Sequence, residues 1–250
     1  WTLVCFAEDL VEQIKPLQSD DVWLVSGGGS GVTAASIIGV ANASRNAGAT
    51  FLLLGRSGLV EETAQWLDWT DEELNKRKMA LRESLIAESE TGKVTMVEWN
   101  NAWMKLTRSM DIYRTISEIE STGNKAEYHS ANVTDSEAIR SAVGDKVVTG
   151  IVHGAGLEES KLVADKAWNT FDLIIRVKID GWKALTSCAS DSLRFACAFT
   201  SVAGRFGNGG QTDYAAANSI LDAEMARLTA NSECRAVAIG WTGWRDVGMA

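Results

Sequence analysis

The sequence predicts an α/β protein built on a doubly wound parallel sheet. Short apolar runs of strand length alternate with helical stretches of ten or more residues along most of the 250-residue chain. In addition, a glycine cluster joins the first apolar run to a stretch with the small and apolar residues of a buried helix. The alternation is interrupted at about residues 58–122, so we expect one domain with a helical insertion after its second strand.

The first elements form one βαβ unit. Residues 22–25, VWLV, are the first expected strand, and the glycine cluster and the helix VTAASIIGVANA follow it. The second strand, at 51–54, ends at Gly55 and Arg56, which gives the roughly 30 residues that a parallel crossover needs. Further buried strands are expected within 126–133, 146–156, 193–204 and 234–241.

The insertion at about 58–122 is predicted to form two amphipathic, charge-rich helices, with VTMVEW as the candidate strand between them. Four of the ten tryptophans lie here: Trp66, Trp69, Trp99 and Trp103. They either bury a small satellite core or form an exposed docking surface. Packing is the favoured interpretation, because a large aromatic side chain mostly contributes burial.

The composition argues against several classes of function. The chain has 33 acidic and 24 basic residues, and the net charge of −9 repels a phosphate backbone, so no nucleic acid partner is expected. No apolar run approaches the roughly 18 residues of a membrane span. The four cysteines lack CxxC spacing and a nearby histidine pair, so neither a metal site nor a disulfide is expected, and a cytoplasmic location is the default.

The glycine cluster SGGGSGVTA has the position of a cofactor-binding turn. Glycines between a first strand and a helix let the backbone approach a pyrophosphate and direct the helix N-terminal amides at it. The GxGxxG pattern is met only as Gly29 and Gly31 with Ala34 in third place, and the alternative is a plain tight turn. The flanking elements favour cofactor binding, for which the candidates are Ser26, Gly27, Gly28, Gly29, Ser30, Gly31 and Val32.

The end of the second strand, LLLGRSG, indicates which nicotinamide cofactor is preferred. An acidic residue at this point accepts a hydrogen bond from a ribose 2′-hydroxyl, whereas an arginine pairs with a 2′-phosphate. No carboxylate lies here, and Arg56 and Ser57, next to Gly55, can hold a phosphate through charge-assisted hydrogen bonds. NADP(H) is therefore expected rather than NAD(H), and the alternative is a solvated surface arginine.

The segment FTSVAGRFGNGGQTDYAAANSILDAE predicts a catalytic site. Ser201 follows a buried strand and Tyr214 begins a helix thirteen residues later, so both are expected to face one crevice. Asn218 lies one helical turn after Tyr214 on the same face. A tyrosine, with a pKa near 10, donates its proton more readily beside a cation that stabilises the phenolate. The candidate cation is Lys178.

Three neighbouring residues are rivals for these roles. Lys183 follows Lys178 by five residues in the same expected helix, which turns its side chain away by roughly 140°. Thr200 precedes Ser201, but adjacent residues of a strand point to opposite faces, so only one hydroxyl is expected to serve. His153 closes a strand beside glycines and is expected to be a structural hydrogen-bonding residue rather than a catalytic one.

In these motifs the chain resembles the ketoreductase domains of polyketide and fatty acid synthases, a Rossmann-type branch of the short-chain dehydrogenase/reductase superfamily. The resemblance covers residues 22–250 and rests on SGGGSGVTA, LLLGRSG, ANVTD, VHGAG, VKIDGWKAL, FTSVAGRFGNGGQTDYAAAN and GWTGWRDVGMA, in the family's order. Ordinary short-chain dehydrogenases place a lysine four residues after the tyrosine, whereas here Asn218 has that place and Lys178 lies upstream, as in the synthase ketoreductases. The insertion is most similar to polyunsaturated fatty acid synthases and to related iterative synthases such as those for heterocyst glycolipids.

The resemblance implies NADPH-dependent reduction of a β-ketoacyl thioester, carried on an acyl carrier protein, to the β-hydroxyacyl thioester. In that mechanism Tyr214 donates a proton to the substrate oxygen, and Ser201 hydrogen-bonds the same oxygen. Lys178 lowers the pKa of the phenol, and Asn218 supports the lysine or a proton-relaying water, with no metal required. The resemblance adds cofactor contacts after the third and fourth strands, at Asn132, Val133, His153, Gly154, Ala155 and Gly156.

The same resemblance predicts the domain organisation and partners. Residues 22–250 are expected to be the catalytic domain, and residues 1–21 the N-terminal stub of a preceding structural half-domain. The start at Trp1 and the end at Ala250 suggest one domain of a longer multidomain synthase, with its other domains as partners. Carrier proteins are usually acidic, so a local basic patch is expected to dock them.

Some positions depart from the family pattern. Thr33 has the place of the last glycine of the fingerprint and is expected to crowd the helix start, and Asn132 replaces an aspartate that contacts adenine. Glu158 and Glu159 only partly match one stereochemical signature, and Phe206 stands where the other class has tryptophan, so the product configuration stays open. Two further hypotheses remain: a free-standing reductase of small carbonyl compounds, and a catalytically silent structural or docking module.

Overall fold

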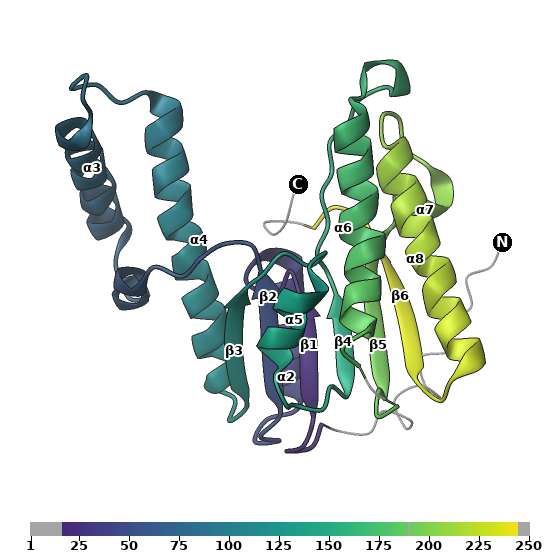
Figure 1. Cartoon of the computed structure of the whole chain (residues 1–250). Helices are drawn as coiled ribbons and strands as arrows, with labels where there is room; N and C mark the ends of the chain where they lie inside the picture. Colours follow the sequence, from purple (N-terminus) through teal and green to yellow (C-terminus); the bar gives the residue numbers. More distant parts are fainter. Residues whose placement is uncertain (1–16, 190, 245–250) are drawn as a thin grey trace.

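The structure, a computed structural model, describes residues 17–189 and 191–244 of the chain. It has three layers, a central sheet with helices on both faces (Figure 1). The expected N-terminal stub lies, up to residue 16, outside the described residues. In the described ranges, no helix is both long and apolar enough to cross a membrane.

The described strands form one six-stranded sheet in the order β3-β2-β1-β4-β5-β6, and each neighbouring pair is parallel. The order reverses between β1 and β4, and ligands of such sheets bind beyond the carboxyl ends of the strands at this point. The predicted doubly wound fold is confirmed. The strands are β1 (Val22–Ser26), β2 (Thr50–Gly55), β3 (Lys125–Ser130), β4 (Gly150–His153), β5 (Phe195–Ser201) and β6 (Arg235–Trp241).

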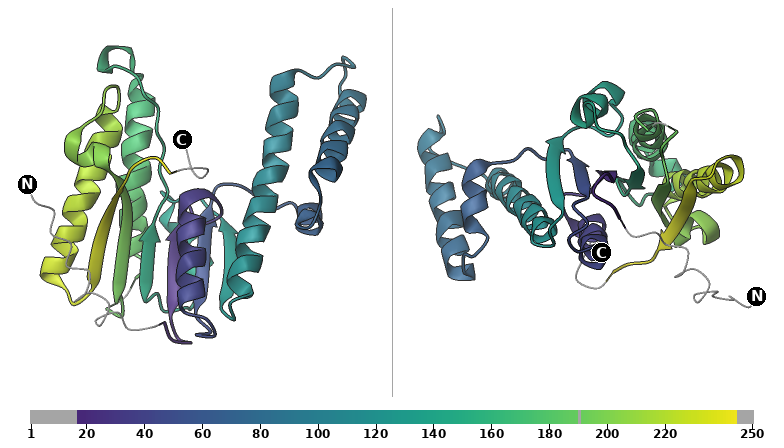
Figure 2. Two further views of the ribbon diagram at one scale, coloured as in Figure 1. Left: turned by 180° about the vertical axis from the view of Figure 1, so that it is seen from behind. Right: turned by 90° about the horizontal axis from the view of Figure 1, so that it is seen from below.

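The helices cover the two faces of the sheet in separate groups. On one face α2 (Gly31–Ala43) packs beside the second half of α4 (Met96–Glu120), as the two orientations of Figure 2 show. The other face carries α5 (Ser136–Val143), α6 (Trp168–Thr186) and α8 (Thr212–Asn231). The short helix α7 (Val202–Phe206) follows β5, and the 3₁₀ turn η2 (Val163–Asp165) precedes α6.

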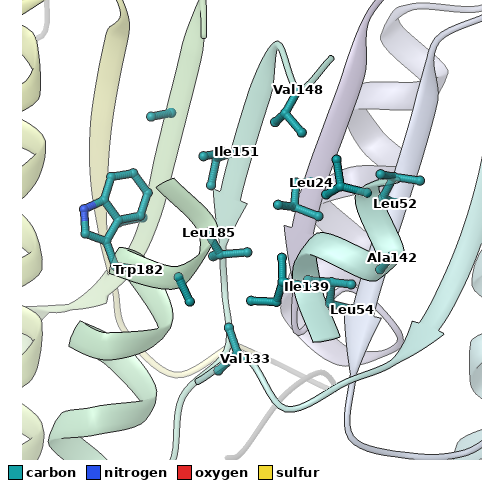
Figure 3. Packing of buried hydrophobic residues seen from close by; sticks show 14 of the residues in the cluster. Leu24, Leu52, Leu54, Val133, Ile139, Ala142, Val148, Ile151, Trp182 and Leu185 are labelled. Carbon is teal, nitrogen blue, oxygen red and sulfur yellow. The ribbon is translucent and has the colours of Figure 1, made fainter. Parts of the chain in front are cut away.

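Consecutive side chains of the central strands point alternately into two hydrophobic cores. Leu24 and Leu52 point to the core beneath α5 and α6, to which Leu185 also belongs (Figure 3). Val25 and Leu53 point to the opposite core, beneath α2. Strands buried on both faces have continuous rather than alternating apolar sequences. This explains the unbroken apolar runs from which these strands are predicted.

The insertion forms an arm, made of η1 (Glu61–Trp66), α3 (Asp71–Glu88) and the first half of α4, that projects beyond the sheet (Figures 1 and 2). Trp66 is buried against Leu106 and Met110 of α4. Its ring stacks on Trp69 at a centroid distance of 5.1 Å and on Trp103 at 6.1 Å. Trp66, Trp69 and Trp103 therefore form a satellite core, as the packing interpretation predicts, whereas Trp99 lies outside this cluster and packs against Lys78 and Arg82.

The candidate strand VTMVEW is instead the end of a loop and the first turn of α4. The Thr95 hydroxyl accepts a hydrogen bond from the Glu98 amide (3.2 Å), and the Glu98 carboxylate accepts one from the Thr95 amide (2.8 Å). The same arrangement of Thr70 and Glu73 starts α3. Such a reciprocal capping box satisfies amides that the helix leaves unpaired and fixes its first residue.

Candidate active site

A cavity of about 560 Å³ opens at the carboxyl ends of β4, β5 and β6. Its walls come from the start of α2, the backbone after β4, the end of β5, the N-terminus of α8 and the segment after β6. The cavity lies next to the reversal of strand order, where the fold predicts a ligand site. Of the predicted site residues, it is lined by Val32, Gly154, Gly156, Lys178, Ser201 and Tyr214.

Asn218 lies behind Tyr214 rather than in the wall of the cavity. It is fully buried, and its Nδ2 donates a hydrogen bond to the Tyr214 carbonyl oxygen at 2.8 Å. Its Oδ1 is buried without a hydrogen-bond partner among the described residues. Gly204 of α7 packs directly on Asn218, since a Cβ at Gly204 would lie 3.0 Å from the Asn218 Cβ. Asn218 thus holds the backbone of Tyr214 and retains one unused acceptor.

Lys178 brings an ammonium group into the buried end of the cavity. Only 3% of the residue is exposed, and its Nζ donates a hydrogen bond to the Phe199 carbonyl oxygen at 2.5 Å. Burial lowers the pKa of Lys178 to about 8, opposed by the charge of Asp222. Gly156 leaves room for the lysine stem, because a Cβ there would lie 2.8 Å from Lys178 Cε. The rival Lys183 is 70% exposed and pairs with Asp180, so it points away as its spacing predicts.

Ser201 ends β5 and caps α7. Its Oγ accepts a hydrogen bond from the Ala203 amide at 3.2 Å, which leaves the hydroxyl proton free to donate. Thr200 also lines the cavity, and its buried hydroxyl has no partner among the described residues. Both residues belong to β5, and the Thr200 hydroxyl is buried, whereas Ser201, at the end of the strand, is half-buried.

The glycine turn has the geometry that a diphosphate requires. Gly27 has a φ of +72°, and a Cβ there would lie 2.9 Å from the Ala155 nitrogen, so only glycine fits. Gly31, with a φ of +69°, faces open space. Helix α2 begins with neither a side-chain cap nor an acidic residue in its first turn. Its N-terminal amides are therefore available to an anion, and the turn fits a dinucleotide cofactor.

Thr33 lies in the first turn of α2 and does not block the helix start. It is buried and lies against Gly154, where any Cβ would overlap the threonine side chain. The crowding expected from the sequence is therefore relieved on the opposite wall, by the glycine after β4.

His153 and Ser26 connect β1, β4 and α6 beneath the cavity. His153 is fully buried, with Nδ1 at 2.6 Å from Ser26 Oγ and Nε2 at 2.9 Å from the Lys178 carbonyl oxygen. A carbonyl only accepts, so Nε2 carries the proton and Nδ1 accepts from the serine hydroxyl. Burial, and the nearby charge of Lys178, lower the pKa of His153 to about 3. The Ala155 amide donates to Ser26 Oγ at 3.3 Å, so this chain of hydrogen bonds fixes the backbone after β4.

The remaining predicted cofactor residues lie at the ends of β2 and β3. The Tyr128 hydroxyl donates to the Ser57 carbonyl oxygen at 2.7 Å and holds the segment that carries the exposed Arg56. After β3, the Asn132 side chain accepts from the Thr134 amide at 3.2 Å, and Val133 is buried in the core. Within residues 17–189 and 191–244, no group of three or more histidine, cysteine or acidic residues is arranged to hold a metal ion.

An aromatic wall of the cavity is not apparent from the sequence. Trp241 and Trp244 line it with Phe199, and the two tryptophan rings meet edge to face at 4.8 Å. The motif GWTGWRDVGMA supports the family resemblance, but it assigns no role to its tryptophans. Phe206 of α7, a stereochemical marker position, is 79% exposed, while Glu158 lines the cavity.

Comparisons with known proteins agree with the fold. The KR domain model matches residues 22–246. A polyunsaturated fatty acid synthase subunit of Thraustochytrium sp. is 29% identical over 244 residues, which make up 94% of this chain and 8% of that protein. Mellein synthase of Phaeosphaeria nodorum is 35% identical over 104 residues, 41% of this chain and 6% of that protein. The chain thus spans a small fraction of the length of these synthases.

Solved structures show the same fold. A ketoreductase domain from the bacillaene assembly line matches with a TM-score of 0.67 and 24% identity, over 95% of this chain and 47% of that one. A structure of A-type ketoreductases from a modular polyketide synthase matches with a TM-score of 0.64 and 23% identity, over 94% and 39% of the two chains. The chain therefore belongs to the KR domain family, the ketoreductase domains of polyketide and polyunsaturated fatty acid synthases, which have the short-chain dehydrogenase/reductase fold.

Proposed function

We propose that the chain reduces a β-ketoacyl thioester to the β-hydroxyacyl thioester with NADPH, as one domain of a multidomain synthase. The observation that supports this most directly is the cavity itself. Lys178, Ser201 and Tyr214 line it together with Gly154 and Gly156 of the backbone after β4. A cation, two hydroxyl donors and a cofactor turn are the groups that carbonyl reduction requires.

Each polar side chain has a distinct part in this chemistry. When bound, a nicotinamide cofactor supplies hydride to the carbonyl carbon. Tyr214 donates its phenolic proton to the carbonyl oxygen, while the free proton of Ser201 forms a hydrogen bond to the same oxygen. Lys178, with a pKa of about 8, is mostly cationic at neutral pH and favours the phenolate that proton transfer leaves.

Asn218 supports proton transfer from behind the tyrosine. It anchors the Tyr214 backbone, and its unpartnered Oδ1 can accept a hydrogen bond from Lys178 or from a water that returns a proton to the phenolate. A buried acceptor without a partner is uncommon in a folded protein, which is consistent with such a transient role.

NADPH is proposed as the reductant because of the residues around its expected ends. The uncapped N-terminus of α2 accommodates the diphosphate, and Arg56 with Ser57 accommodates the 2′-phosphate. Arg56 is exposed and makes no ion pair within the described residues, so its guanidinium remains available for a phosphate. The predicted cofactor contacts of Asn132 and Val133 complete this part of the proposal.

The substrate is proposed to arrive on an acyl carrier protein of the same assembly. The curated relatives are synthases much longer than this chain, and the polyunsaturated fatty acid synthase subunit matches nearly all of it. The aromatic wall of Phe199, Trp241 and Trp244 offers an apolar surface to an acyl chain. The proposed partners are therefore a carrier protein and neighbouring synthase domains.

The proposal is tested by following NADPH oxidation at 340 nm with acetoacetyl-coenzyme A and with an acetoacetyl carrier protein. Wild type should turn over, with NADPH preferred to NADH. Tyr214→Phe should lose on the order of 100-fold or more in kcat, because general acid catalysis by a positioned group contributes that much. Tyr113→Phe, a matched change on α4, should behave as wild type.

Other outcomes discriminate the alternatives. NADPH binding without turnover of either thioester would indicate a silent module. Equal turnover of a small free ketone would indicate a reductase of general carbonyl compounds, and absence of NADPH binding would refute the cofactor assignment.

A further inference from the structure

Two loops form facing walls of the cavity and are joined to each other by polar contacts. The β4–α6 loop (residues 154–167) contributes Glu158, and the α7–α8 loop (residues 207–211) contributes Gln211. The Gln211 side-chain amide donates to the Glu158 carboxylate at 3.1 Å, and the Lys161 backbone amide donates to the Gly210 carbonyl at 3.0 Å. The side-chain contact is exposed to solvent and holds the loops only weakly.

A further contact between the loops is buried. Lys166 Nζ lies 2.5 Å from Asp213 Oδ1 and donates to the Gly210 carbonyl at 3.1 Å. The two side chains are only 3% and 0% exposed. Among the ion pairs of the described residues, it is the one in which both partners are buried. By contrast, the pair Asp21–Arg194 leaves the arginine side chain half exposed.

The pair is directly connected to the proposed proton donor. Asp213 lies in the first turn of α8, and the oxygen that contacts Lys166 also accepts a hydrogen bond from the Tyr214 backbone amide at 2.9 Å. Neither Lys166 nor Asp213 lines the cavity. One carboxylate oxygen thus connects the β4–α6 loop to the backbone that carries the Tyr214 phenol.

We infer that Lys166 and Asp213 form a latch that positions Tyr214 against the β4–α6 loop, and that both are positioning residues for the reductase reaction. The inference rests on the proposed function, because it assigns their effect to the chemistry of Tyr214. Displacement of a reacting group by about 1 Å costs on the order of 100-fold in rate. A latch at the residue next to the phenol therefore controls kcat.

Stability alone accounts poorly for this pair. Two charges that leave water lose hydration free energy, and a buried ion pair is often no more stabilising than apolar residues of similar size. The second oxygen of Asp213, Oδ2, is also buried without a partner among the described residues. An arrangement that leaves an acceptor unsatisfied is not optimised for stability, but it does fix the direction of the Asp213 carboxylate.

The test compares Lys166→Met, Asp213→Asn and the double variant with wild type in the 250-residue protein. The measurements are kcat and KM with NADPH and acetoacetyl-coenzyme A, the thermal midpoint, and backbone hydrogen exchange of residues 156–167. In the double variant no charge is left unpaired, and the introduced amide side chain keeps an acceptor for the Tyr214 amide. The matched control is Arg194→Met, which removes an ion pair at the opposite end of the sheet.

Stability and activity should separate in the double variant. We expect its thermal midpoint to recover relative to Lys166→Met, while kcat stays roughly 10-fold or more below wild type, with KM for NADPH unchanged and faster exchange in residues 156–167. Arg194→Met should lower the midpoint and leave kcat within about twofold.

Two outcomes would overturn the latch. One is a double variant whose kcat returns to the wild-type value together with its midpoint, and the other is unchanged exchange in residues 156–167. The test of the latch depends on kcat and hydrogen exchange of the double variant. It can therefore be carried out even if one of the single variants does not fold. Failure of the proposed function is distinct, since wild type itself would then show no turnover, while exchange would still report whether the latch holds the loop.

Discussion

Replacing Lys178 with methionine is expected to change how the stability of the fold depends on pH. Burial lowers the pKa of Lys178 from 10.5 to about 8, and unfolding restores the ordinary value. Between pH 8 and 10.5 the unfolded chain therefore binds more protons than the folded one, so the free energy of unfolding of wild type rises with pH. Below pH 8 the cost of the buried charge is fully present, and it is relieved as the amine loses its proton.

The magnitude follows from the two pKa values. Their separation corresponds to a cost of about 3 kcal/mol at neutral pH, of which roughly 2 kcal/mol is relieved by pH 9.5. Methionine does not titrate, so the stability advantage of Lys178→Met over wild type should shrink by about 2 kcal/mol from pH 7 to pH 9.5. The hydrogen bond from Nζ to the Phe199 carbonyl affects the absolute difference more than its slope with pH.

The assay is urea unfolding at pH 7 and at pH 9.5, followed by tryptophan fluorescence. Lys183→Met is the matched control, because that lysine lies on the same helix with its side chain 70% exposed. Its stability difference from wild type should be nearly constant with pH. If the difference in free energy of unfolding between wild type and Lys178→Met is the same at pH 7 and at pH 9.5, Lys178 does not carry the buried charge. The reasoning about the cation that assists Tyr214 then fails.

Further predictions concern the substrate, the cofactor and the arm. Ser201→Ala should lower kcat on the order of 100-fold in the NADPH assay, because it removes a preset donor to the developing oxyanion. Arg56→Ala should raise KM for NADPH by roughly tenfold without changing KM for NADH, because a charge-assisted contact to the 2′-phosphate is lost. Trp66→Ala should destabilise the arm by about 3 kcal/mol or more, because it leaves a cavity in the satellite core. The loss of stability is measured as faster proteolysis within residues 61–110.

Each of these changes has a matched control. Ser219→Ala removes an exposed hydroxyl from α8, Arg45→Ala removes an exposed arginine after α2, and Met79→Ala shortens a side chain of α3 that is 49% exposed. All three should resemble wild type. An equal effect of a control and its partner would mean that the loss comes from general destabilisation. Loss of NADH turnover in Arg56→Ala would contradict a role specific to the 2′-phosphate.

The fold was predictable because the central strands β1, β2, β4 and β5 are buried runs of apolar residues that alternate with helical segments. The choice of Lys178 was also predictable. Five positions along a helix turn the side chain of Lys183 away from the side chain of Lys178. Predictions failed where a local signal competed with the period. VTMVEW has the apolar character of a strand, but the capping box of Thr95 and Glu98 starts a helix within it.

Contacts between distant segments could not be predicted from one sequence. Lys166 and Asp213 are 47 positions apart and meet only because two loops fold over the same cavity. Lysine and aspartate are mostly exposed in proteins, so the sequence does not indicate that these two side chains are buried. The complementarity of Thr33 and Gly154 is hidden in the same way, because its two halves come from α2 and the backbone after β4.

The helix α4 contributes to two hydrophobic clusters, the satellite core of the arm and the core beneath α2. Its 25 residues contain neither glycine nor proline, and at about 37 Å it is long enough to carry the arm at one end and to pack on the sheet at the other. Near the sheet, the Thr115 hydroxyl donates to the Gly29 carbonyl at 3.1 Å, within the cofactor turn. One uninterrupted helix therefore links the arm to the backbone of Gly29, with no glycine or proline between them at which the helix would bend.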